Sequence, residues 1–166
     1  MIMRFFHFFV LFIRNFPAVV HGLSKIQEQQ QLFDISLNHI RKQGGPSASN
    51  INRTSLVTCL YRSRTYDGTE RGCAAAPFIT KYEERLEGRN FTDLVDNCSS
   101  NVDPVAVRNV FFVRDLQVAH DRGAVIEVAF SQRLATDGEF MSGYEDRMKR
   151  LAEQYGLVYT PPKAAE

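Results

Sequence analysis

The stretch "TCLYRSRTYDGTERGCAAAPFI", residues 58–79, decides the fold expected for this chain. The residues that lead into it, 56–61, are mostly β-branched, apolar or aromatic, which favours a strand. Asp67-Gly68 is a strong signal for a tight hairpin turn. Residues 73–79 then supply the predicted returning strand, in which Pro77 either closes the strand at a sheet edge or starts a helix. The stretch therefore predicts a β-hairpin at the centre of the chain.

Three amphipathic helices are predicted around this hairpin. The first covers residues 24–42, where Ser24 is the N-cap and apolar residues gather on one side. The second opens at Asp103-Pro104, an acidic N-cap followed by proline, and ends near residues 120–123. The third covers residues 140–155, with apolar residues at three- and four-residue steps. The predicted fold class is α+β, with one β-hairpin or small antiparallel sheet packed against about three amphipathic helices.

Shorter elements are predicted between the helices. Residues 47–54 are polar and are expected to form a loop, and residues 80–86 and 92–97 are expected to form short helices. Residues 125–130 are compatible with a strand or with a continuation of the second helix. Glu83, Glu84 and Glu87 are interpreted as a solvated acidic face.

Length and charge exclude several classes of protein. The 166 residues correspond to one domain, expected over residues 24–160, with a loose tail at 161–166. The 20 basic and 19 acidic residues nearly cancel, so global charge does not favour a nucleic-acid partner. No segment reaches the roughly 20 consecutive apolar residues of a membrane span.

The first 23 residues form a hydrophobic leader. Arg4 followed by an apolar run over residues 5–13 resembles a signal peptide, but His7 and Arg14 interrupt the pattern. The alternative is that residues 1–23 are not part of the working domain. The first interpretation predicts export and the second predicts a cytoplasmic protein.

The cysteines allow three interpretations. Cys59, Cys73 and Cys98 make an odd count, which argues against a disulfide scaffold. Cys59 and Cys73, at comparable distances from the turn, could bind zinc with His120, but the tight Cys-x2-Cys spacing of zinc sites is missing. The same thiols could use His120 as a catalytic base, although adjacent Asp121 is not expected to face its imidazole. The third interpretation is that both thiols simply pack in the core, without zinc or any other cofactor.

Arginine and tyrosine gather on the predicted hairpin. Tyr61, Arg62, Arg64, Tyr66 and Arg71 are the candidate binding residues. Both residue types are enriched where proteins bind proteins, and together they could also stack on bases or contact phosphates. The alternative is a solvated edge strand protected by its charges. No phosphate loop, His-Glu-x-x-His sequence or nucleophile elbow is present, which favours a protein that is not an enzyme.

The order of these features resembles a family of small proteins found in tailed phages and prophages. The likeness rests on Cys-x-Tyr-Arg at 59–62, Gly68, Cys73, Glu87-Gly88 and Leu-Gln-x-x-His-Asp at 116–121. It covers about residues 26–162 and omits the leader. Relatives often have glycine at the position of Ala75 or Ala76, and the loop before Asp67 is longer here. The resemblance implies a phage or prophage origin and a cytoplasmic site in the infected bacterium, and it supplies no reaction.

These observations lead to one expected function and two alternatives. We expect a phage accessory protein that binds a host or phage protein through the hairpin and counters a host defence system. The first alternative is a zinc or thiol protein that uses Cys59, Cys73 and His120. The second is a nucleic-acid-binding protein that uses the arginines of the hairpin.

Overall fold

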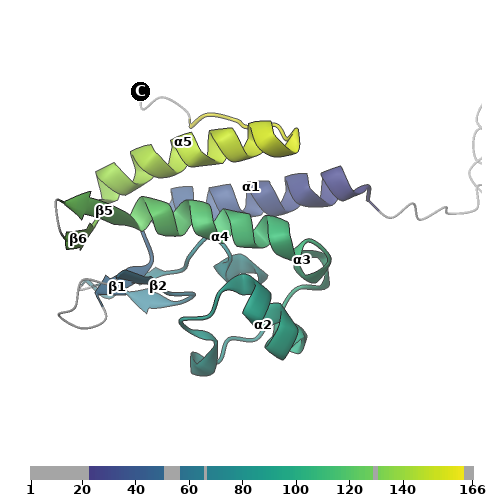
Figure 1. Cartoon of the computed structure of the whole chain (residues 1–166), viewed down its shortest axis with the longest axis horizontal. Helices are drawn as coiled ribbons and strands as arrows, with labels where there is room; N and C mark the ends of the chain where they lie inside the picture. Colours follow the sequence, from purple (N-terminus) through teal and green to yellow (C-terminus); the bar gives the residue numbers. More distant parts are fainter. Residues whose placement is uncertain (1–22, 51–56, 66, 129–130, 163–166) are drawn as a thin grey trace, which may run out of the picture.

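Three long helices form one layer of the molecule (Figure 1). The computed structural model describes residues 23–50, 57–65, 67–128 and 131–162, so the leader expected at 1–23 lies almost entirely outside the described residues. Helices α1 (Lys25–Gln43), α4 (Val110–Ala124) and α5 (Asp137–Tyr155) lie side by side, and α5 runs antiparallel to α4. Among the helices of these ranges, none has the length and apolar character needed to cross a membrane.

The ends of α1 are those that the sequence predicts. The Ser24 hydroxyl accepts the Gln27 backbone N–H, and the Gln27 side chain accepts the Ser24 N–H, so the first turn carries a capping box. Gly44 ends the helix in the left-handed conformation, at φ 70°. Its buried face packs into the layer through Leu32, Phe33, Ser36, Leu37 and Ile40.

Helix α5 begins three residues before its predicted start. Thr136 and Glu139 form a second capping box, which the apolar periodicity alone did not reveal. The buried face then follows three- and four-residue steps, through Phe140, Tyr144, Met148, Leu151 and Ala152. Burial of each large apolar side chain contributes about 1.5–3 kcal/mol, so this face anchors the helix to the layer.

The helix predicted from Asp103 to about residue 122 is two helices. Asp103 caps α3 (Pro104–Arg108) as expected, because its carboxylate accepts the Val105 N–H at 2.8 Å. Asn109 then leaves the helical conformation, at φ −115° and ψ 32°, and α4 begins at the next residue. The Asn109 side chain donates to Glu28 of α1 at 2.8 Å, so the break ties α3 and α4 to the first helix.

The strands pair as three two-stranded antiparallel sheets within the described residues, which confirms the α+β class. They are β1 (Ala48–Asn50) with β2 (Val57–Cys59), β3 (Ser63–Arg64) with β4 (Glu70–Arg71), and β5 (Val125–Val128) with β6 (Ser131–Leu134). The prediction of one central hairpin is therefore wrong in its pairing. The loop predicted at residues 47–54 contains strand β1 at 48–50, and its residues 51–54 lie outside the described residues. Strand β2 pairs with β1, and the turn at Asp67-Gly68 joins only the short strands β3 and β4.

The predicted returning strand at residues 73–79 is also wrong. This segment turns at once into the 3₁₀ helix η1 (Ala76–Phe78), because Pro77 cannot donate to a strand ladder. Cys59 consequently faces Ala48 in the β1–β2 ladder and not Cys73. The chain then continues through the remaining short helices, η2 (Glu84–Leu86), α2 (Phe91–Cys98) and η3 (Ser99–Asn101).

Candidate functional site

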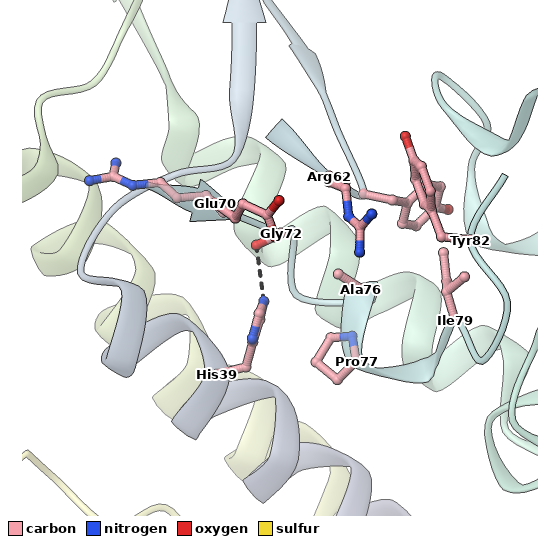
Figure 2. A pocket seen from close by; sticks show the side chains of 10 residues that line it. His39, Arg62, Glu70, Gly72, Ala76, Pro77, Ile79 and Tyr82 are labelled. Carbon is pink, nitrogen blue, oxygen red and sulfur yellow. Dashed lines mark hydrogen bonds between the residues drawn. The ribbon is translucent and has the colours of Figure 1, made fainter. Parts of the chain in front are cut away.

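A pocket of about 310 Å³ opens beside the β3–β4 hairpin, between α1 and the segment that contains η1 (Figure 2). Arg62 and Tyr82 lie on one side of it, and His39 reaches from α1 toward Gly72 on the other. The lining residues include no Ser, Thr, Cys or Lys, and the polar side chains they do include are those of His, Arg, Glu and Tyr.

Glu87 fixes the backbone at the rim of this pocket. Its carboxylate accepts the backbone N–H groups of Tyr61 and Arg62, each at 2.8 Å, and the Tyr82 hydroxyl, also at 2.8 Å. Burial and the hydrogen bond to Glu87 raise the pKa of Tyr82 to about 12, so its phenol stays protonated. The interpretation of Glu87 as part of a solvated acidic face is therefore wrong.

Arg62 and Tyr82 form an ordered pair at the surface. The Arg62 guanidinium carbon lies 4.7 Å from the centre of the Tyr82 ring, a cation–π distance. Arg62 is exposed and forms no salt bridge within the described residues. Because Glu87 holds both the Arg62 backbone and the Tyr82 hydroxyl, the pair is positioned before any partner arrives.

The floor of the pocket is the peptide of Gly72. The Gln43 side chain donates to its carbonyl at 2.9 Å and accepts its N–H at 3.0 Å, and the His39 Nε2 donates to the same carbonyl at 3.2 Å. Two residues of α1 thus supply the hydrogen-bond partners of the Gly72 N–H and carbonyl groups, in place of a neighbouring strand. These bonds attach the hairpin to the helical layer.

His39 makes the stability of this contact dependent on pH. Burial lowers the pKa of its imidazole below the ordinary 6.5, although the bond to the Gly72 carbonyl acts in the opposite direction. Between pH 6.5 and the lower pKa of the folded chain, the unfolded chain binds more protons, so stability falls as the pH is lowered through this window.

We expect the free energy of unfolding to decrease when the pH is lowered from about 7.5 to about 5.5, and His39→Gln to reduce that decrease. Glutamine keeps an N–H donor for Gly72 and does not titrate. Urea denaturation of both proteins at the two pH values measures the difference. An identical pH dependence in the variant would show that other groups are responsible.

The predicted binding residues do not all reach the surface. Tyr61 is 4% exposed, and its hydroxyl donates to the Arg89 carbonyl at 3.0 Å, so it belongs to the core and not to the binding surface. Arg71 forms a two-point ion pair with Asp137 of α5, at 2.7 and 2.8 Å, which holds the hairpin to the layer. Arg64 is exposed and pairs with Glu70 at 3.1 Å.

Arg62 and Arg64 remain as the exposed candidates, whereas Tyr66 lies outside the described residues. Tyr82, which the sequence analysis did not single out, is the tyrosine that accompanies Arg62. The residue that orders both, Glu87, could be recognised in the sequence only as part of the Glu87-Gly88 pair.

The proposed metal ligands have other roles where they are described. Cys73 is fully buried, and the Cys59 side chain lies outside the described part of the chain. The His120 Nε2 accepts the Ser47 N–H at 3.1 Å, and its Nδ1 lies 3.2 Å from the Asp121 carboxylate. Asp121 therefore does face the imidazole, contrary to expectation. In the described ranges, no three His, Cys, Asp or Glu side chains gather as a metal site would require.

The geometry thus places exposed Arg62 and half-buried Tyr82 at the mouth of a small pocket. Exposed Arg64 lines an adjoining hollow that shares Arg62 with this pocket. We call the surface of Arg62, Arg64 and Tyr82 the Arg62 surface. Comparison of the chain with protein-family models, with curated proteins and with solved structures finds no match.

Proposed function

We propose that this chain is a phage accessory protein that binds a host or phage protein through the Arg62 surface. The phage origin rests on the resemblance of the motifs at 59–62, 68, 73, 87–88 and 116–121 to phage and prophage proteins. A role against host defence rests on no residue of the chain and follows only the common use of such small phage proteins. The binding role rests on the site itself. The partner is expected to offer a carboxylate to Arg62 and apolar atoms to the Tyr82 ring and the neighbouring Pro77.

The observation that carries this proposal is the fixed position of the Arg62–Tyr82 pair. Arginine and tyrosine are the residue types most often found at the energetic centre of protein interfaces. A flexible arginine loses side-chain entropy when it is bound, but here the ring of Tyr82 and the carboxylate of Glu87 already hold the pair. Exposed Pro77 adds a rigid apolar edge to the same pocket.

The experiment is a capture of partners from bacterial lysate with the full chain, compared with its Arg62→Glu/Arg64→Glu variant. We expect a partner that stays bound to the original chain and binds the variant at least about 30-fold more weakly. Replacing a residue at the energetic centre of an interface costs about 2 kcal/mol or more of binding free energy. Affinity is then measured with the purified partner by calorimetry. A partner bound equally by both proteins would exclude the Arg62 surface as the contact.

A matched control separates the site from the change in charge. Lys25 and Lys149 are exposed and lie on α1 and α5, away from the pocket. Lys25→Glu/Lys149→Glu changes the net charge by the same amount and should leave the partner bound. Equal loss of binding in both double variants would point to general charge attraction. If the chain captures no protein partner but is retained on DNA in a salt-sensitive way, the nucleic-acid alternative is favoured.

A further inference from the structure

A second site is a groove of about 440 Å³ that is lined by residues of α4 and α5, which lie side by side in Figure 1. Three arginines line it: Arg122 from α4, and Arg147 and Arg150 from α5. Within the described residues, none of the three forms a salt bridge. Other arginines of the described chain do have carboxylate partners, as in Arg41–Glu145, Arg108–Glu28 and Arg133–Glu139.

The two helices leave space for one of these guanidinium groups. A Cβ atom at Gly143 would lie 2.7 Å from Nη1 of Arg147, and a Cβ atom at Gly123 would lie 3.8 Å from it. Glycine inside a helix is less stable than alanine, so Gly143 has a cost for α5. The absence of a side chain at Gly143 leaves room for the guanidinium group of half-buried Arg147 between α4 and α5.

The positive charges in the groove repel one another. Burial lowers the pKa of Arg147, and the neighbouring charges of Arg150 and Arg122 lower it further. The acid at the edge of the groove, Asp115, already accepts hydrogen bonds from Arg114 at 2.8 Å and from the Tyr155 hydroxyl at 2.7 Å. Asp146 lies close enough to Arg147 to offset only part of this repulsion.

We propose that the groove formed by Arg122, Arg147 and Arg150 binds a phosphate group. A carboxylate carries one negative charge and would leave most of this positive charge unmatched. A phosphate monoester carries about −1.5 to −2 at neutral pH, with three acceptor oxygens that the planar guanidinium groups can contact in pairs. Val118, Ala119 and Leu151 add apolar atoms to the groove, which suits the organic part of a phosphorylated compound.

The test is a titration of the full chain at low salt with inorganic phosphate and with phenyl phosphate, followed by calorimetry and by the rise in Tm. We expect saturable binding of one phosphate group per chain, weakened about tenfold or more by Arg147→Gln, because hydrogen bonds to a charged group are the strong ones. Arg150→Gln, at an exposed position, gives a second variant should the first fail to fold. Arg85→Gln is the control, because Arg85 is exposed, pairs with Glu83 and lies outside the groove.

A short oligonucleotide without a terminal phosphate distinguishes the two sources of the group. Tighter binding of phenyl phosphate identifies a small phosphorylated compound, and tighter binding of the oligonucleotide identifies a nucleic-acid backbone. Either result supports the proposal only if Arg147→Gln or Arg150→Gln weakens binding of the probe and Arg85→Gln does not. No saturable binding of any of the three probes, or equal weakening by the control, would overturn the proposal.

Discussion

Gly72→Ala should destabilise the folded chain by about 3 kcal/mol, at the upper end of the range for overpacked positions. A Cβ atom at this position would lie 2.6 Å from Cβ of Ala76 and 2.9 Å from the backbone oxygen of Tyr61. A backbone atom cannot move aside as the end of a long side chain can. The hydrogen bonds of Gly72 to Gln43 and His39 would have to lengthen as the hairpin shifts. Urea denaturation measures the change.

The control for this variant is Gly138→Ala, in the first turn of α5. No atom lies within 4 Å of a Cβ atom built there, so the substitution meets no obstacle. It should stabilise the chain by about 0.4–1 kcal/mol, because alanine loses less backbone freedom on folding. Gly72→Ala at wild-type stability would mean that the pocket floor is not fixed by the α1 contacts.

The helices could be predicted from the sequence because their signals are local. Ser24 and Gly44 bound α1, and the apolar steps of residues 140–155 identify most of α5. Each signal involves residues within one or two turns, where the backbone geometry is fixed by the helix itself. The break at Asn109 was not visible, since it depends on a contact to Glu28, which is 81 residues away.

The pairing of the strands could not be predicted, because β ladders join residues whose spacing is not fixed locally. The turn at Asp67-Gly68 was recognised, yet the short strands beside it contribute only two pairs of residues. Of the two roles expected for Pro77, closing a strand at an edge or starting a helix, the structure has the second, because Pro77 lies in the first turn of the 3₁₀ helix η1. With residues 73–79 assigned as a strand, Cys59 and Cys73 became apparent cross-strand neighbours, and the zinc hypothesis gained geometric support that the ladder does not provide.

Only part of the candidate site could be predicted, because its residues come from segments that are far apart in the sequence. Arg62 and Arg64 were identified because a continuous strand would place both on one face. In the structure β2 ends at Cys59 and β3 begins at Ser63, so Tyr61 and Arg62 lie in neither strand, and Tyr61 enters the core. Tyr82 and Glu87 come from a different segment, and only the tertiary fold brings them to Arg62. The sequence thus contained the charge of the site but not the residues that hold it in place.

His120→Ala should lower the free energy of unfolding by about 4 kcal/mol, the largest single effect that we expect. The imidazole is fully buried, with its ring centre 5.1 Å from that of Phe140, so its removal leaves a cavity. It also leaves the buried Ser47 N–H without the Nε2 acceptor at 3.1 Å. Ser47 in turn contacts the segment between β2 and β3, since its hydroxyl donates to the Leu60 carbonyl at 2.8 Å and lies 2.8 Å from the Ser63 hydroxyl of β3.

His120→Gln distinguishes this structural role from that of a metal ligand. The glutamine Oε1 can accept the Ser47 N–H, so the loss should fall to about 1–2 kcal/mol. Zinc should change the Tm of the original chain and of the variant by the same small amount. A rise in Tm with zinc that the original chain shows and His120→Gln loses would reverse this assignment, because only a ligand bound to the folded state stabilises it in this way. The Cys59 and Cys73 thiols would then be the next ligands to replace.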